Sequence, residues 1–204
     1  MTVLVHRFFS PALALALVLV VSACSAGAAP TQTPWDGGHD CPTSQPAPLP
    51  AGETRTVTME TGKGQIVMKV ESDLSPIAVA NFVALATCGF YDGTVFHRIV
   101  PGFVIQGGAR KGAPSYTLQD EPVTATYHRA TVAMAKTGAP NSATSQFFIV
   151  LDDASAASLP QTGTYQILGA VTSGMETVDA IAGAADKENP SHPVIIDTAA
   201  VTNP

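Results

Sequence analysis

Hydrophobic and polar residues alternate in short runs over most of the chain after residue 52. Residues 55–59 and 65–71 each place apolar side chains at every second position, and Gly62-Lys63-Gly64 forms a turn signal between them. Two alternating runs around a Gly-rich turn predict a β-hairpin. Shorter apolar runs bounded by turn residues predict further strands at 95–100, 103–106, 130–135, 146–151, 167–171 and 194–201.

Two segments carry a helical period instead. Ser75-Pro76 is a helix start, with Ser at the N-cap and Pro at the first helical position. Val79, Phe82, Val83 and Ala86 then recur at helical spacing, and Gly89 predicts the end. A second helix is expected from Ser173-Gly174 to Gly183. Many short strands with two helices favour a mainly β fold built as a closed antiparallel barrel, although the pattern alone leaves the topology open.

The first residues have a different pattern. Residues 8–21 form an apolar run of 14 residues after the weakly basic His6-Arg7. A membrane-spanning helix needs about 18 or more apolar residues, so this run fits the core of a secretory signal peptide. Val21-Ser22-Ala23-Cys24 resembles the lipobox of bacterial lipoproteins, in which the Cys is lipidated and becomes the new N-terminus. We therefore expect residues 1–23 to be a lipoprotein signal peptide and Cys24 to carry lipid, an ordinary signal peptide being the alternative.

Residues 24–52 are rich in Pro, Gly and Ala, as in Pro46-Ala47-Pro48-Leu49-Pro50. Such a segment buries too little apolar surface to offset its chain entropy, so it is predicted to be a tether. Trp35 is an exception that could dock on the domain or remain solvated. The expected folded domain spans residues 53–204, and the protein would be anchored on the extracytoplasmic face of the cell membrane.

The amino-acid composition excludes several classes of function. Hydrophobic residues make up 46% and charged residues 13%, which excludes a charged disordered tail protein. Lys plus Arg is 10 against 16 Asp plus Glu, so a nucleic-acid binder with a basic surface is excluded as well. No Cys or His spacing indicates a zinc site, and no G-x-S-x-G elbow indicates a serine hydrolase. We expect no metal, no cofactor and no nucleic-acid partner.

Three longer segments are more specific than this texture. They are the run 81–93, the run 96–108 (FHRIVPGFVIQGG), and Met134-Ala135 with residues 145–149 (SQFFI). These segments resemble the signature blocks of the cyclophilins, the peptidyl-prolyl cis–trans isomerases, over about residues 56–201. The resemblance implies a closed eight-stranded antiparallel barrel with two capping helices. It also implies an enzyme that isomerises X–Pro bonds of secreted or surface proteins and so assists their folding.

The resemblance also assigns a site. Arg98 would donate to the prolyl nitrogen of the twisted amide, and Gln106 would hold the substrate backbone and help to orient Arg98. Main-chain groups of Ala135 and Lys136 would contact the substrate, so the Lys136 side chain should matter little. His97 is interpreted as structural or peripheral, because the reaction transfers no proton. The expected lining of the proline pocket is Phe103, Val104, Met134, Phe148, Leu159 and Tyr165.

A second function from another class remains open. A cyclophilin fold could serve as a binding module or chaperone that grips Pro-containing chains with little catalysis. Such a binder could keep the apolar pocket and lose the arginine, so Arg98 together with Gln106, Phe103 and Phe148 favours the enzyme. The expected partners are Pro-containing polypeptides and, through the lipid, the membrane; the protein itself is expected to be a monomer.

The remaining cysteines allow two interpretations. After Cys24 is used, Cys41 in the tether and Cys88 at the end of the first helix remain in an oxidising compartment. They could form a disulfide that pins the tether to that helix. Alternatively, Cys88 is a buried free thiol and Cys41 is exposed or paired between molecules.

Overall fold

The structure is a computed structural model that describes residue 1 and residues 41–111, 114–159 and 164–203. The predicted signal peptide, Cys24 and Trp35 lie outside the described residues. No helix within the described ranges has the length and apolar content needed to cross a membrane.

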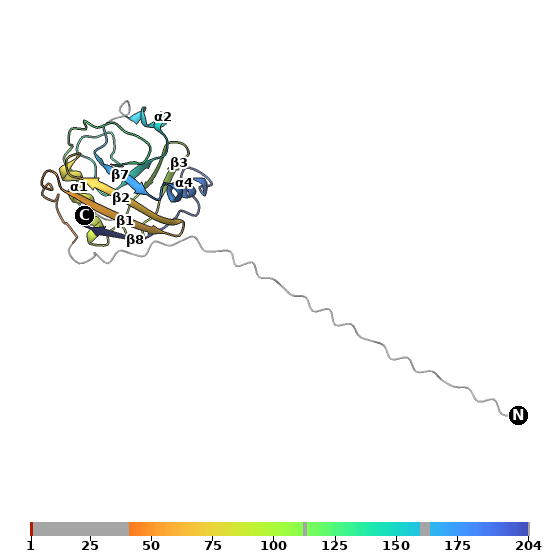
Figure 1. The fold of residues 1–204 in the computed structure, drawn as a ribbon. Helices are drawn as coiled ribbons and strands as arrows, with labels where there is room; N and C mark the ends of the chain where they lie inside the picture. Colours follow the sequence, from red (N-terminus) through yellow and green to blue (C-terminus); the bar gives the residue numbers. More distant parts are fainter. Residues whose placement is uncertain (2–40, 112–113, 160–163, 204) are drawn as a thin grey trace.

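Eight antiparallel strands form one curled sheet (Figure 1). Along the sheet their order is β3-β4-β6-β5-β7-β2-β1-β8. The predicted hairpin is β1 paired with β2, with Thr61 opposite Gly64 at its turn. The strands are β1 (Thr54–Thr61), β2 (Gly64–Glu71), β3 (Arg98–Val100), β4 (Val104–Gly107), β5 (Thr131–Met134), β6 (Phe147–Val150), β7 (Ile167–Ser173) and β8 (Ile196–Thr202).

The prediction of a closed barrel is wrong, because the edge strands β3 and β8 do not pair. All three residues of β3 pair with β4, and the other edge of β3 meets the loop before β8, where Ile99 N donates to Glu188 O. Loop contacts bridge the open seam instead. Val95 and Ile195 form an isolated bridge, Phe96 N donates to Val194 O at 3.0 Å, and Ile99 N donates to Glu188 O at 2.7 Å. The sheet is therefore an open half-barrel whose seam is held by the loop between the last helix and β8.

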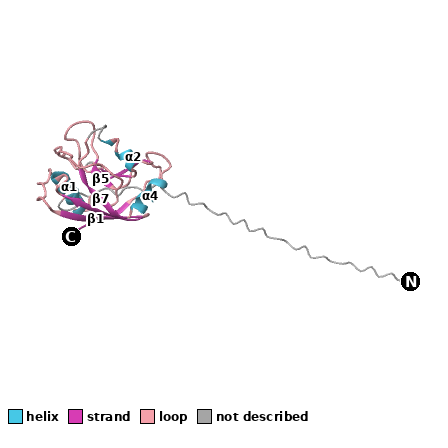
Figure 2. Cartoon of the chain, turned by 45° about the horizontal axis from the view of Figure 1, so that its top comes forward, coloured by secondary structure: helices cyan, strands magenta, loops and turns pink. Residues whose placement is uncertain are grey.

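The two predicted helices are α1 (Pro76–Thr87) and α4 (Met175–Gly183), which lie at opposite ends of the curled sheet in Figure 2. A further short helix, α2 (Asp153–Ala156), lies in the segment after β6. The Asp152 side chain accepts hydrogen bonds from Ala154 N and Ser155 N and so caps α2.

Helix α1 begins where the sequence predicted, but its cap is different. The Ser75 hydroxyl donates to Leu74 O and makes no capping bond. The carboxylate of Glu121 accepts Ile77 N at 2.8 Å and Ala78 N at 2.9 Å in its place. A carboxylate is favoured at a helix N-terminus, where N–H groups lack partners inside the helix. This long-range cap also holds the loop around Glu121 against α1.

The central strands bury both of their faces, and β5 and β6 have no exposed residue. Alternate side chains of these strands enter two separate apolar clusters. The inner cluster joins the sheet to the helices α1 and α4 and includes Phe82, Ile105, Val132, Phe147 and Ile149. The outer cluster lies on the opposite face and includes Val104, Tyr127, Ala133, Phe148, Val150, Leu159 and Ile167.

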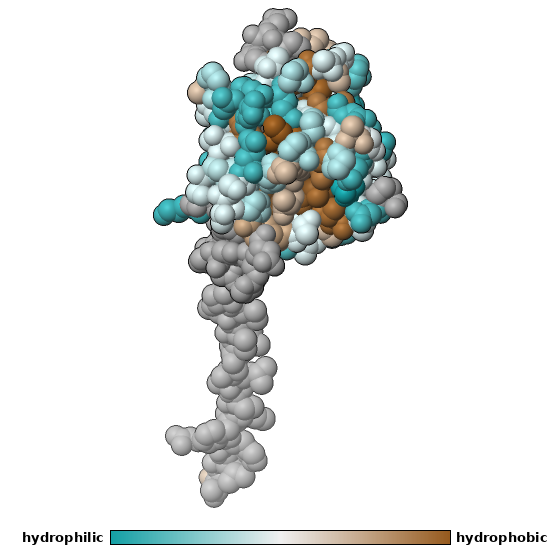
Figure 3. Space-filling view, turned by 90° about the vertical axis from the view of Figure 1, so that its left-hand side faces the viewer, coloured by the Kyte–Doolittle hydropathy of each residue, from teal (hydrophilic) through white to brown (hydrophobic). Residues whose placement is uncertain are grey.

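The molecular surface has a mixed character. Figure 3 shows one face, on which hydrophobic residues form limited groups between hydrophilic ones. Among the described residues, Met1 is the one large hydrophobic residue whose side chain is exposed.

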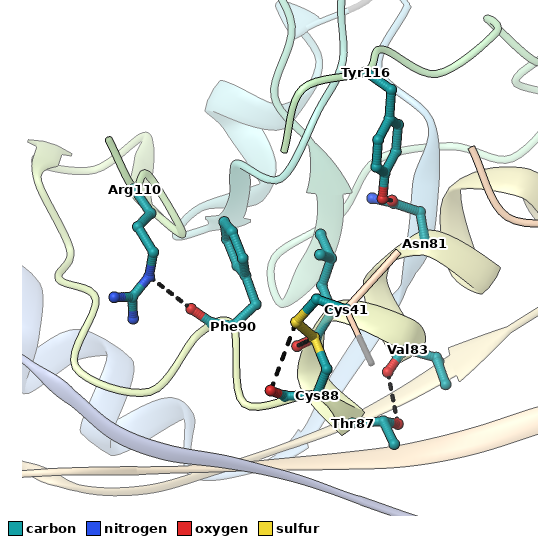
Figure 4. Close-up of a disulfide and its surroundings, with 9 residues drawn as sticks. Cys41, Asn81, Val83, Thr87, Cys88, Phe90, Arg110 and Tyr116 are labelled. Atoms are coloured by element: carbon teal, nitrogen blue, oxygen red, sulfur yellow. Dashed lines mark hydrogen bonds between the residues drawn. A yellow bond between two sulfur atoms is a disulfide. The ribbon is translucent and has the colours of Figure 1, made fainter. Parts of the chain in front are cut away.

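The later part of the expected tether lies against the domain rather than apart from it. Leu49 packs on the inner cluster, and Leu49 N donates to Pro76 O at 3.2 Å. The Ser72 hydroxyl donates to Pro50 O, and Gln119 N donates to the Gln45 side chain. Figure 4 shows a disulfide between Cys41 and Cys88 at the end of α1, with the two Cα atoms 5.2 Å apart. Of the two interpretations of these cysteines, the structure contains the bridged one.

We predict that the Cys41–Cys88 bridge forms in the mature protein and stabilises it. The bond closes a 47-residue separation, for which the chain-entropy model gives about 4 kcal/mol of stabilisation, less any strain. Mass spectrometry under non-reducing conditions should show no alkylated thiol at either position. Denaturant unfolding should show a lower stability for Cys41→Ser and for the reduced wild type. Two freely alkylated thiols in the unreduced protein would contradict the prediction.

Candidate active site

A row of residues runs inward from the edge strand β3 on the outer face of the sheet. In β3 and β4, Arg98 lies opposite Gln106. In turn, Gln106 lies opposite Phe148 of β6, and Phe148 lies opposite Ala133 of β5. Directly opposed residues of neighbouring strands share a face, so this row places a cation, an amide and an aromatic ring side by side.

The turn between β3 and β4 positions the next site residue. Phe103 N donates to Val100 O at 2.9 Å, which closes a four-residue turn over Pro101 and Gly102. Gly102 has φ +70°, as the third residue of a type II turn requires, and Pro is favoured at the position before it. Phe103 O then accepts Leu151 N at 2.8 Å, so the residue is fixed from both sides.

These elements surround a pocket of about 340 Å³ on the outer face. The floor of the pocket is the aromatic ring of Phe148, which is 4% exposed. This ring meets the Tyr165 ring edge-on, with the two centroids 5.3 Å apart. Nine of the residues predicted from the sequence line it, namely Arg98, Phe103, Val104, Gln106, Ala135, Lys136, Phe148, Leu159 and Tyr165.

The prediction for Met134 differs from the structure. Met134 is fully buried and packs in the inner cluster with Val132, while Ala133 between them belongs to the outer cluster. The cause is the two-residue period of strand β5, which points alternate side chains to opposite faces. Met134 therefore supports the sheet from the core side and does not line the pocket.

Tyr127 holds one wall of the pocket through its hydroxyl group. The hydroxyl donates to Tyr165 O at 2.7 Å and accepts Tyr165 N at 2.8 Å, which fixes the backbone that carries the Tyr165 ring. Tyr127 is buried in the outer cluster, and this burial raises the pKa of its phenol above the ordinary value. The hydroxyl thus stays protonated at neutral pH and can donate and accept at once.

The polar partners at the pocket edge also differ from expectation. Gln106 was expected to orient Arg98, but Gln106 Nε2 donates to Gln146 Oε1 at 2.9 Å. Arg98 is held instead by Glu188, whose Oε1 accepts Nε of Arg98 at 2.8 Å. The N–H of Ala135 donates to Gln146 O and is therefore not available to a ligand.

The side chain of Lys136, which borders the pocket, forms an ion pair. Its side chain is 13% exposed, and its ammonium group lies 2.8 Å from Asp120 Oδ2. The same oxygen accepts Asn141 N at 3.0 Å. Although burial favours the protonated acid, Lys136 and Asn141 hold the pKa of Asp120 below its ordinary value. A second hollow of about 360 Å³ adjoins the first and shares Gln106, Ala135 and Lys136 with it.

His97 lies outside the pocket lining, as its interpretation as a peripheral residue requires. Burial lowers the pKa of the imidazole, and contacts with Val95 and Gln146 only partly oppose that effect. Its neutral form therefore dominates at pH 7. Among the described residues, no group of three or more His, Cys, Asp or Glu side chains is placed to hold a metal ion.

Sequence reasoning missed the residues that hold the site rather than line it. Gln146, Tyr127 and Glu188 are 40, 38 and 90 positions away from their partners along the chain. Gln146 lies within the SQFFI segment, so it could have been chosen as a neighbour of Phe147. Nothing in the local sequence around Tyr127 or Glu188 indicates a partner so distant.

Comparison with known proteins agrees with the geometry. The family described as "Cyclophilin type peptidyl-prolyl cis-trans isomerase/CLD" matches residues 56–201. The chain therefore belongs to the cyclophilin-type peptidyl-prolyl cis–trans isomerases, as its signature segments predicted. The fold described above is that of this class of enzyme.

This chain matches individual relatives over nearly their full length. Peptidyl-prolyl cis-trans isomerase B of Escherichia coli is 38% identical over 163 residues, which span 72% of this chain and 99% of that protein. The isomerase cyp18 of Streptomyces antibioticus is 35% identical, spanning 72% of this chain and 98% of that protein.

Solved structures give the same result. A cyclophilin-type isomerase of Cryptosporidium parvum aligns with a TM-score of 0.64 and 31% identity, over 74% of this chain and 99% of that one. A second crystal structure of that protein, obtained in the presence of the dipeptide Ala-Pro, aligns with a TM-score of 0.64 and 30% identity over 73% of this chain and 99% of that one.

We predict that Tyr127→Phe loosens the pocket wall. The substitution removes both hydrogen bonds to Tyr165 and leaves the part-buried N–H of Tyr165 without its partner, at a cost of about 1 kcal/mol in stability. A displaced Tyr165 should also raise KM for a proline peptide. Tyr116→Phe is the matched control, because its hydroxyl donates to the Asn81 side chain and does not line the pocket. Equal KM values for the two variants would contradict a role of Tyr127 at the site.

Proposed function

We propose that this enzyme isomerises X–Pro bonds of secreted or surface polypeptides, with Arg98 stabilising the twisted prolyl amide above an apolar pocket. The observation that carries the proposal is the position of Arg98. Its side chain borders the same pocket whose floor is Phe148, and the two residues lie in one row across three strands.

The reaction sets what the site must supply. Rotation about a peptide bond has a barrier of ~18–20 kcal/mol, because the twisted amide loses its conjugation. No bond is broken, so a nucleophile is not needed. In the twisted state the prolyl nitrogen becomes pyramidal and basic, and a hydrogen-bond donor aimed at it stabilises that state more than the planar ground state. The guanidinium of Arg98 is such a donor.

The pocket would hold the proline ring. Phe103, Phe148 and Leu159 offer apolar surface, and a pocket of about 340 Å³ is large enough for a small ring with its neighbouring atoms. The related Cryptosporidium parvum protein was crystallised in the presence of Ala-Pro, which supports an X–Pro segment as the ligand. Gln106, fixed by Gln146, would contact the backbone of the chain beside the proline.

Arg98 supplies only part of the rate enhancement. A hydrogen bond to a charged group contributes ~1.5–3 kcal/mol. A rate enhancement of about 10⁵-fold needs roughly 7 kcal/mol. The remainder would come from burying the proline and holding the chain on both sides of it, so that the bound segment is already close to the twisted geometry.

We predict that Arg98→Ala lowers kcat/KM for a short X–Pro peptide by roughly 10- to 150-fold, the equivalent of ~1.5–3 kcal/mol. A coupled isomerisation assay on the folded variant measures this. Arg55→Ala is the matched control, because it removes a cation that pairs with Glu53 on the hairpin away from the pocket. Equal activity of wild type and Arg98→Ala would refute the mechanism. Unchanged peptide binding by a protein without isomerase activity would favour the alternative of a binding module or chaperone.

We also propose that the mature protein is a lipoprotein, anchored through Cys24 on the extracytoplasmic face of the membrane. The apolar run 8–21 ending in Val21-Ser22-Ala23-Cys24 supports this. The Cys41–Cys88 disulfide would fix the domain 17 residues after the lipidated cysteine. This spacing would place the isomerase where exported chains fold.

We predict that Cys24→Ala releases the protein from the membrane or leaves it unprocessed. Lipid chains contribute ~0.8 kcal/mol per buried CH₂, and two chains give stable anchoring. Fractionation of cells that express the variant, with intact-mass analysis, measures both outcomes, and Ser25→Ala is the matched control beside the processing site. A Cys24→Ala protein that is processed and membrane-bound like wild type would exclude lipid anchoring.

A further inference from the structure

We propose that Glu188 is a positioning residue for Arg98, holding the guanidinium in one orientation at the edge of the pocket before substrate arrives. The inference rests on the proposed role of Arg98 in the reaction. Glu188 lies in the loop between α4 and β8, 90 positions beyond Arg98, and it belongs to none of the segments that line the pocket.

The side-chain contact is directional. Oε1 of Glu188 accepts Nε of Arg98 at 2.8 Å. A guanidinium has five N–H donors in one plane, one on Nε and two on each of the terminal Nη atoms. No hydrogen bond from the Nη atoms of Arg98 to another described residue is formed. Glu188 therefore uses one donor and leaves the terminal donors of the fork for a ligand.

The backbone of Glu188 is fixed to the same strand. Glu188 O accepts the N–H of Ile99 at 2.7 Å, and Ile99 follows Arg98 in β3 and is 1% exposed. Within the same loop, the side chain of Asp186 accepts a hydrogen bond from Ser191 N at 2.9 Å. Thus one residue contacts β3 through its main chain and its carboxylate, and the carboxylate stays in register with Arg98.

The expected effects on folding stability and on kcat distinguish a positioning role of Glu188 from a structural one. The Arg98 and Glu188 side chains are 36% and 57% exposed, and exposed ion pairs contribute little to folding stability. An arginine side chain, however, loses considerable rotamer freedom when it is held in one geometry. If Glu188 restricts those rotamers in the free enzyme, less ordering remains for the transition state. The effect should then appear in kcat and leave stability almost unchanged.

The first experiment measures kinetics of the full mature chain with an X–Pro peptide. We expect Glu188→Ala to lower kcat/KM by about three- to tenfold, mostly through kcat, with an unchanged unfolding midpoint. Glu188→Gln keeps the size and a carbonyl acceptor, so it should retain part of the activity. Asp197→Ala is the matched control, because it removes an exposed carboxylate from β8 away from the pocket, and its kinetics should equal those of wild type.

The second experiment asks whether Glu188 acts through Arg98. In an Arg98→Ala background, Glu188→Ala should cause no further loss, because the group that it positions is gone. An equal fold-loss in both backgrounds would overturn the proposal and indicate a structural role. If Arg98→Ala itself has no effect, the proposed mechanism fails first. If Arg98→Ala is impaired while Glu188→Ala matches wild type, this inference alone fails.

A spectroscopic measurement tests the contact directly. The Nε–H of Arg98 should give an NMR resonance that is protected from exchange with water in wild type. In Glu188→Ala the same resonance should shift and exchange rapidly, whereas Asp197→Ala should leave it unchanged. An unprotected Arg98 resonance in wild type would show that the carboxylate does not hold the guanidinium, and would overturn the proposal.

Discussion

The structure depends on the alternation of side chains along the short central strands. Because successive residues of β4, β5 and β6 point to opposite faces, each strand contributes to the inner and to the outer cluster at once. Ile105, Phe147 and Ile149 lie in the inner cluster together with residues of α1. Val104, Phe148 and Val150 lie in the outer cluster, and the first two of them line the pocket. A shift of one residue in register would exchange the two sets and destroy both the core and the site.

The open seam of the sheet lies between the edge strands β3 and β8. Strand β3 places Arg98 opposite Gln106 through its pairing with β4, and its other edge is left for the loop that precedes β8. The loop after α4 supplies the missing hydrogen bonds, through Glu188 O and Val194 O. The seam of the open half-barrel is thus bridged by irregular backbone at the edge where the proposed catalytic arginine lies, and this brings a loop residue, Glu188, beside β3.

Most of the fold could be predicted from the sequence, because its signals are local. The hairpin β1–β2 showed alternation around a Gly-rich turn, and α1 and α4 showed helical spacing with start and end residues. Closure could not be predicted, since it depends on the pairing of two edges nearly a hundred residues apart. Met134 was placed in the pocket from its position in a signature segment, but its strand parity directs it to the core.

The candidate site shows the same division between local and distant signals. Residues that line the pocket lie mostly in two signature segments, so the sequence identifies them together. The residues that hold them are polar and act over long sequence distances: Tyr127 holds Tyr165, Gln146 holds Gln106 and Glu188 holds Arg98. An apolar floor tolerates small movements, because dispersion and hydrophobic contacts have no direction. The polar groups above it must be aimed, and their aim depends on these distant hydrogen bonds. A substitution in the loop that carries Glu188 can therefore alter how the proposed catalytic arginine is held while the strands beneath it stay the same.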